Sequence, residues 1–314
     1  MSKTSLPLTG KKLVKVKFVK KSGVKKKIDT KLIVIYCGIV LYGVAVIVIH
    51  IIAQLESSFQ MSSLTNFASP VTKKLAPKEV ISFLSQFTPC DVSDSLNECG
   101  IANGGFIPNL VNYSPVTKST SVVGKAYTVL YAPKSDPRPA VKQSYIDNVP
   151  EDAIVVIGLP LALQTINAPY VKVNNALYGG LMSTRAKYRK ANGSVILGRI
   201  RDLDEHNDLK YPVWSYGVGT SAPGPLVKVV GINVPLEVKV TNSDPSMTEE
   251  ILTIFPGDYL IADKNGVVKL KDDNQLSKIL DYIPKRVDAD TKVSEDIKKG
   301  KPAAESQKHW RGKI

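Results

Sequence analysis

The sequence predicts a layered α/β domain that follows one membrane-spanning helix. Beyond residue 76, short strand-like runs outnumber helical ones, and the two kinds do not alternate regularly enough for a doubly wound sheet. Before residue 76, one long apolar run has the length of a membrane span. The expected parts are a basic segment (1–31), the span (32–53), a linker (54–75), the α/β domain (76–284) and a charged tail (285–314).

The membrane span is predicted from Leu32 to Ala53. This run, LIVIYCGIVLYGVAVIVIHIIA, has 22 residues and carries no formal charge when His50 is neutral. That length is enough to cross a bilayer. A buried core helix and a cleaved signal peptide are the alternatives, although the apolar core of a signal peptide is usually shorter. We therefore expect the chain to contact a membrane through this helix.

The net charge of +14 is concentrated at the two ends of the chain. Residues 1–31 hold eleven lysines against one acid, Asp29, and residues 285–314 hold nine basic against five acidic residues. The remaining residues therefore sum to zero, since 14 − 10 − 4 = 0. No interior segment interleaves basic and aromatic side chains, so nucleic-acid binding is not expected.

The same charge asymmetry predicts the orientation of the span. Lysines precede it, whereas residues 54–72 contain no Lys or Arg. By the positive-inside rule the N-terminus is cytoplasmic, and the α/β domain is lumenal or extracellular. A mitochondrial membrane is the alternative location. Mitochondrial presequences are rich in arginine, and the first arginine of this chain is Arg138.

Two short helices are expected at the start of the domain. Pro77 is suited to the first turn of one helix, and Asp91 to the cap of a second helix that ends at Gly100. Cys90 and Cys99 then lie at opposite ends of the second helix. That separation is too large for a disulfide, so free thiols are expected.

Strands follow at fairly regular intervals and precede a last helix. They are expected at 121–131, 153–159, 195–199, 211–218, 227–230 and 235–240. Residues 255–270 are typical of a hairpin that turns at Asn265-Gly266. A final short helix is predicted at 275–282. The tail from Lys285 is charged and poor in apolar residues, so we expect it to be disordered.

The stretch from Asn175 to Asp202 carries the candidate site. Gly179 and Gly180 precede a helix that is expected to begin near Leu181, with a strand after it. Glycines allow a ligand to approach the backbone, and the first N–H groups of a helix can bind a carboxylate. A simple turn is the alternative explanation for the two glycines.

An Arg-Asp pair ends that strand. Arg201 offers a planar fork that matches a carboxylate, and Asp202 is a hard oxygen ligand for a divalent cation such as Mg2+. A surface ion pair or a helix cap would use the same residues. If the pair and the glycines meet, a metal and an oxo acid can share one pocket.

Five ordered segments carry a family resemblance. GKAYTV, EDAIVVIG, NALYGGLMSTRA, GRIRD and PGDYLIADKNGVV occur in this order between about residues 78 and 282. In order and spacing the chain resembles the RraA-like family, which contains the regulator of ribonuclease activity A and the 4-hydroxy-4-methyl-2-oxoglutarate aldolases. The resemblance implies a β/β/α layered sandwich that forms a homotrimer or a hexamer of two trimers, with sites at subunit interfaces.

The resemblance also implies an activity and residue roles. Aldolases of this family bind pyruvate with a divalent metal, usually Mg2+ with Mn2+ as an alternative, cleave 4-hydroxy-2-oxo diacids and decarboxylate oxaloacetate. By position, Arg201 corresponds to the catalytic, substrate-binding arginine and Asp202 to the metal ligand. The backbone N–H groups of Leu181 and Met182 correspond to those that hold the pyruvate carboxylate.

The chain departs from the aldolase pattern at two places. Many aldolases have an acid where this chain has Gly180, and another where it has Ser221, Ala222 and Pro223. These acids hold metal-bound water in the enzymes. Their absence favours the alternative of a non-catalytic regulatory or binding protein, as in family members that dock to ribonuclease.

Other catalytic classes find less support. The segment GVGTSAPG lacks the G-x-G-x-x-G spacing of a nucleotide loop, which argues against a methyltransferase. Metal-assisted cleavage of a 2-oxo acid needs neither a lysine Schiff base nor a catalytic histidine. We accordingly expect His206, close to Asp202, to be a solvated loop residue.

Overall fold

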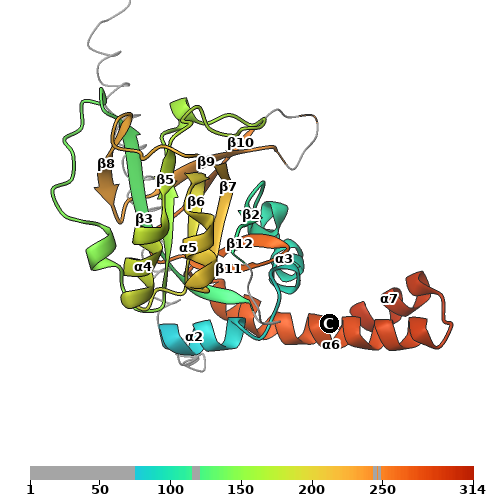
Figure 1. Ribbon diagram of the computed structural model, residues 1–314. Helices are drawn as coiled ribbons and strands as arrows, with labels where there is room; N and C mark the ends of the chain where they lie inside the picture. The colour runs from blue at the N-terminus through green and yellow to red at the C-terminus, as the bar shows by residue number, and fades with distance from the viewer. Residues whose placement is uncertain (1–74, 115–120, 243–245, 247–248) are drawn as a thin grey trace, which may run out of the picture. The chain divides into compact units, whose positions relative to one another are not determined.

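The computed structural model describes residues 75–114, 121–242, 246 and 249–314 (Figure 1). The basic segment, the span expected at 32–53 and the linker before residue 75 lie outside these residues. Among the helices of the described residues, none is both long enough and apolar enough to cross a membrane. The membrane span and its orientation thus stay predictions.

One mixed sheet forms the centre of the fold. Its strands are β1 (Phe106–Ile107), β2 (Val111–Asn112), β3 (Val122–Pro133), β4 (Ala153–Gly158), β5 (Ala176–Tyr178), β6 (Gly193–Ile200), β7 (Val213–Val218), β8 (Val227–Ile232), β11 (Tyr259–Asp263) and β12 (Gly266–Leu270). The order is β1-β12-β11-β3-β4-β6-β7-β2, with β5 beside β6 and β8 beside β3. Strands β3, β4, β6 and β7 are parallel, as is β5 to β6, and the other pairings are antiparallel.

Different layers cover the two faces of this sheet. A hairpin of β9 (Leu236–Val240) and β10 (Glu250–Ile254) packs on one face, while α4 (Gly180–Tyr188) and α5 (Leu203–Asp208) cover the other (Figure 1). In β4, Val156 packs with Val238 of the hairpin, and its neighbour Val155 belongs to the core that contains Ala186 of α4. Strand β4 is apolar throughout because both faces are covered. The predicted layered α/β architecture is confirmed.

A third core lies where β11 and β12 meet α2 (Pro77–Leu84), α3 (Pro89–Glu98) and α6 (Leu276–Lys298). Helix α3 begins one turn earlier than the expected cap. Thr88 is the N-cap, and its backbone N–H donates to Asp91 Oδ2 at 2.8 Å while Asp91 N–H donates back to Thr88 Oγ1 at 3.2 Å. Cys90 and Cys99 are free thiols, as predicted.

The tail is helical, so the expectation of disorder from residue 285 was wrong. Helix α6 continues to Lys298, well past the short helix expected at 275–282, and α7 (Ala303–Arg311) folds back against it (Figure 1). Asp296 Oδ2 accepts hydrogen bonds from Ser306 Oγ at 3.0 Å and Trp310 Nε1 at 2.9 Å. Lys301 Nζ also lies 2.9 Å from Asp296 Oδ1. Because hydrogen bonds and ion pairs hold α7 here, low apolar content does not indicate disorder.

The β11–β12 hairpin turns one residue earlier than predicted. Asp263 pairs with Gly266, which leaves Lys264 and Asn265 as the two loop residues. Gly266 has a φ of 139°, and a Cβ at this position would lie 2.8 Å from the ring of Phe106. Gly266 is therefore needed at the start of β12 instead of within the turn. Short 3-10 turns complete the described chain at Ala102–Gly105, Ile146–Asn148 and Leu161–Leu163.

Candidate functional site

The predicted site residues come together at the ends of two neighbouring strands. Strand β5 runs into the N-terminus of α4, and β6 runs into α5. The two strands are parallel and adjacent, and the N–H of Arg201 donates to the carbonyl of Tyr178 at 3.1 Å. Since carboxyl ends of parallel strands share one sheet edge, the two glycines lie beside the Arg-Asp pair.

Asp202 is the centre of these contacts. Its Oδ2 accepts a hydrogen bond from the N–H of Gly180 at 3.1 Å and lies 3.3 Å from Arg201 Nε. Its backbone is left-handed, with φ 62° and ψ 49°, a conformation that costs a non-glycine residue about 1–2 kcal/mol. Among the described residues, Asp202 Oδ1 has no hydrogen-bond partner. The side chains of Arg201 and Asp202 are 38% and 32% exposed, so a small ligand can reach both.

Gly179 is required by this packing. A Cβ at residue 179 would lie 2.5 Å from Asp202 Oδ2 and 3.2 Å from Arg201 Nε. Real Cβ atoms essentially never approach another atom to 2.5 Å, and they rarely approach one to 3.2 Å. Gly179 thus does more than make a turn, because it lets the Arg-Asp pair approach the start of α4.

The N-terminus of α4 has fewer open N–H groups than predicted. The N–H of Gly180 is bonded to Asp202, and that of Met182 donates to the carbonyl of Gly179 at 3.0 Å. In the described part of the chain, the N–H of Leu181 has no partner, and its side chain is 72% exposed. Leu181 is therefore the better placed of the two predicted carboxylate donors.

Three buried hydroxyl side chains form a hydrogen-bonded cluster next to the site. Ser194 Oγ on β6 donates to the hydroxyl of Tyr178 at 3.0 Å and lies 3.1 Å from the hydroxyl of Tyr211. Burial raises the pKa of Tyr178 to about 12, so its phenol stays protonated. This group joins β5, β6 and the segment after α5, and so holds the strand ends in register.

His206 is buried, which contradicts the expectation of a solvated loop residue. It lies on α5, and its ring stacks on Tyr178 with 6.0 Å between centroids. Among the described residues neither ring nitrogen has a hydrogen-bond partner. Burial lowers the pKa of His206, so the ring is neutral at pH 7. It packs beneath the Arg-Asp turn as an uncharged side chain.

The loop at 221–223 returns to the start of β5 without bringing an acid. The carbonyl of Ser221 accepts from Ala176 N–H at 2.9 Å, and that of Ala222 accepts from Asn175 Nδ2 at 2.6 Å. The residues 221–223 themselves therefore do not supply the second acid of the aldolase pattern.

Glu205 is the site residue that sequence reasoning missed. A Cβ built on Gly180 would overlap the carboxylate of Glu205 and would lie 2.6 Å from Glu205 Cβ. The sequence does indicate that Glu205 lies on the same side of a helix as Asp202, because residues three apart on a helix share a face and Glu205 follows Asp202 by three. That α5 lies against the start of α4 was not visible in the sequence.

These residues fit a divalent cation of the Mg2+ type. Among the described residues, no group of three or more His, Cys, Asp or Glu side chains is arranged to hold a metal. Mg2+ needs no such cage, since proteins usually bind it through one or two carboxylates while water and substrate oxygens complete the shell. Asp202, which is partly exposed and has one unbonded oxygen, matches that requirement.

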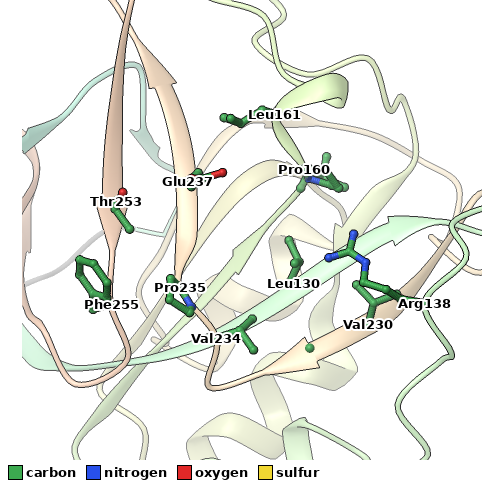
Figure 2. A pocket seen from close by; sticks show the side chains of 12 residues that line it. Leu130, Arg138, Pro160, Leu161, Val230, Val234, Pro235, Glu237, Thr253 and Phe255 are labelled. Carbon is green, nitrogen blue, oxygen red and sulfur yellow. The ribbon is translucent and has the colours of Figure 1, made fainter. Parts of the chain in front are cut away.

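A separate cavity of about 670 Å³ lies between β8, the end of β4 and the β9–β10 hairpin (Figure 2). None of the predicted site residues lines it. Its walls are mainly apolar, and its one arginine, Arg138, already donates two hydrogen bonds of 2.9 Å to Asp136. The cavity lining therefore offers an oxo acid no cation that lacks an anionic partner.

Comparison with known proteins agrees with this fold. Residues 89–269, more than half of the 314 residues, match the family model described as RraA-like, Aldolase/RraA. Protein DlpA of Legionella pneumophila is 27% identical over 195 residues, which cover 60% of this chain and 28% of DlpA. This chain thus spans less than a third of the length of that relative.

Two solved structures show the same fold. An uncharacterized protein from Pseudomonas syringae pv. tomato has a TM-score of 0.57 at 23% identity, with 74% of this chain and 100% of that chain covered. Streptomyces coelicolor RraAS2, described as an unusual member of the RNase ES inhibitor RraA protein family, has a TM-score of 0.51 at 18% identity. The match covers 71% of this chain and 96% of RraAS2.

Proposed function

The chain belongs to the Aldolase/RraA family, and from this premise we propose that it is a divalent-metal-dependent carbon-carbon lyase. Its substrate is a 2-oxo diacid that yields pyruvate, either 4-hydroxy-4-methyl-2-oxoglutarate by aldol cleavage or oxaloacetate by decarboxylation. The observation that supports this most is the meeting of Arg201 and Asp202 at the N-terminus of α4, where the N–H of Leu181 is open.

Each residue has a role that follows from its contacts. Arg201 and the N–H of Leu181 bind the substrate carboxylate, because both are donors that face the same helix end. Asp202 holds the divalent cation through Oδ1, while Oδ2 stays hydrogen-bonded to the N–H of Gly180. When bound, the cation supplies Lewis-acid polarisation of the 2-oxo group.

Arg201 also contributes to the chemical step. Breaking the C3–C4 bond leaves negative charge on the former oxo oxygen, and a guanidinium nearby lowers the energy of that charge. Arg201 is held by the contact with Asp202, so it needs little reorganisation as the charge develops. Decarboxylation asks less of acid-base groups than aldol cleavage does, so oxaloacetate is the first substrate to test.

The test measures pyruvate release by the full-length chain in mild detergent. Oxaloacetate and 4-hydroxy-4-methyl-2-oxoglutarate are each supplied with Mg2+, with Mn2+ or with EDTA. We expect metal-dependent turnover that falls at least about 100-fold in Asp202→Asn, while Asp204→Asn, on the same helix, changes it little. Arg201→Lys keeps the charge but loses the fork, so KM should rise as kcat falls. Unchanged turnover in Asp202→Asn contradicts the proposed site.

A non-catalytic regulatory or binding protein is the second candidate. The absence of an acid among residues 221–223 favours it, and RraAS2 is described as belonging to an inhibitor family. A folded chain that releases no pyruvate from either substrate with either metal would support this candidate over the lyase.

We further propose that the chain is anchored by a single span at 32–53, with the N-terminus cytoplasmic and the domain lumenal or extracellular. The support is the lysine asymmetry around the span, with a mitochondrial membrane as the alternative. Protease added to the cytoplasmic side of sealed vesicles should leave the domain intact, and its digestion would overturn the orientation. Light scattering of the detergent-solubilised chain tests the homotrimer or hexamer that we propose.

A further inference from the structure

Glu205 occupies the space that a side chain at residue 180 would fill. Because residue 180 is glycine, the Glu205 side chain can lie directly over its backbone, and a Cβ there would overlap the carboxylate. The carboxylate comes from α5 instead of α4, but it lies where an acid at residue 180 would begin. A side chain at residue 180 and the observed position of the Glu205 side chain therefore exclude each other.

Two carboxylates then converge on Gly180. Asp202 Oδ2 is bonded to its N–H at 3.1 Å, and Glu205 lies against its Cα side. In the described part of the chain, the Glu205 carboxylate has no hydrogen-bond or ion-pair partner, and its side chain is exposed. Like charges placed close together repel, and a cation bound beside them relieves that repulsion.

We propose that Glu205 is the second acid of the metal site, which replaces the missing side chain at residue 180 and binds the hydration shell of the cation held by Asp202. The proposal rests on the lyase function proposed above and deepens it. Mg2+ keeps several of its waters in protein sites, so a carboxylate just outside the direct ligands can hold the ion through them. Outer-shell groups of this kind commonly change metal affinity about 10–100-fold.

A structural role for Glu205 predicts something different. The carboxylate also lies at the N-terminus of α4, where negative charge stabilises a helix whether or not a metal is bound. In that case Glu205→Gln would lower the thermal stability of the metal-free chain and leave its metal affinity unchanged. Metal affinity and metal-free stability therefore separate the two roles.

The experiment measures Mn2+ binding to the full-length chain by electron paramagnetic resonance, with Mg2+ as competitor. Glu205→Gln keeps the shape of the side chain and removes its charge, and Asp204→Asn removes one charge from the same turn of α5 as the matched control. We expect Glu205→Gln to weaken Mn2+ binding at least about 10-fold. Asp204→Asn should stay within about twofold of the unaltered chain.

A swap of the acid between helices gives a second, independent test. Glu205→Gly removes the three atoms nearest to a Cβ at residue 180, which all belong to the Glu205 side chain, and Gly180→Asp then restores an acid from α4. We expect Glu205→Gly to bind Mn2+ weakly and the double variant Glu205→Gly/Gly180→Asp to recover most of the affinity. Recovery cannot come from a role of Glu205 in the packing of α5, because the double variant still lacks that side chain.

The outcomes distinguish this inference from the proposed function. If Asp202→Asn abolishes Mn2+ binding but Glu205→Gln binds as tightly as Asp204→Asn, the role of Glu205 is refuted and the lyase proposal stands. If the unaltered chain binds no Mn2+, both are refuted. Weakened binding in Glu205→Gln with rescue by the swap supports both.

Discussion

Replacing Gly179 by alanine places a methyl group against the carboxylate of Asp202. The new Cβ would lie 2.5 Å from Asp202 Oδ2, whereas ordinary contact begins at 3.4 Å, so the oxygen must retreat by 3.4 − 2.5 = 0.9 Å. Its hydrogen bond from the N–H of Gly180 is already 3.1 Å long. A retreat of that size breaks it, since the bond has no slack.

The size of the effect follows from that lost hydrogen bond. A hydrogen bond to a charged group contributes about 1.5–3 kcal/mol to the free energy of unfolding. In a domain of this size each kcal/mol corresponds to a shift of about 2–4 °C in Tm, so Gly179→Ala should lower Tm by about 3–12 °C. Arg201 Nε is 3.2 Å from the new Cβ, so the guanidinium moves as well and Mn2+ and pyruvate binding should both weaken.

Gly224→Ala is the matched control. A Cβ at Gly224 would meet nothing within 4 Å, so the same chemical change is made where it should be tolerated. Differential scanning calorimetry and Mn2+ titration of the two variants form the assay. Equal Tm and equal Mn2+ affinity in Gly179→Ala and Gly224→Ala would show that the glycine is only a turn residue, and the site as described would be wrong.

Two further predictions concern the support of the site and the tail. Ser194→Ala removes the shared partner of the Tyr178 and Tyr211 hydroxyls, and should lower the free energy of unfolding by about 1–3 kcal/mol in urea titrations, while exposed Ser277→Ala should not. Hydrogen bonds from Lys301 and other groups lower the pKa of Asp296 from 3.8 to about 2. Because folding lowers this pKa, the contacts of Asp296 stabilise the fold at pH values above its unfolded-state pKa, and that stability is lost as pH falls toward its folded-state pKa. We therefore expect α7 to stay docked at neutral pH and to lose protection from hydrogen exchange as pH falls from about 4 to 2. Unchanged protection across that range would contradict this.

The central strands were predictable because a strand that is buried on both faces is a continuous apolar run in the sequence. Strand β4 is apolar at every position and was expected at 153–159, against the observed Ala153–Gly158. Strand β5 has three residues and gives no periodic signal, so it was not predicted. Helix α6 did carry a signal, since its buried Leu276, Ile279 and Ile283 are spaced by three or four residues. That spacing continues beyond Pro284, where the charged composition favoured disorder.

The pairs that hold the tail could not be found in this way. Arg286 lies 3.2 Å from Asp94 and 3.4 Å from Glu98, almost two hundred residues earlier in the chain. Nothing in the local sequence identifies such partners. From the sequence alone, a buried charged residue with a distant partner cannot be told apart from a solvated one. The charged composition of the tail therefore led to a wrong prediction of disorder.

The candidate site shows the same division between local and long-range information. The Gly-Gly and Arg-Asp segments were recognised because each has a local chemical rationale, and parallel pairing of β5 with β6 brings them together. The role of Glu205 depends on where α5 runs after β6, which is determined at Asp202. Its left-handed backbone, with φ 62°, turns the chain so that α5 starts immediately and returns over Gly180. The residue that binds the metal in this proposal is thus also the residue that directs the second acid, so a change in its backbone would disturb both carboxylates at once.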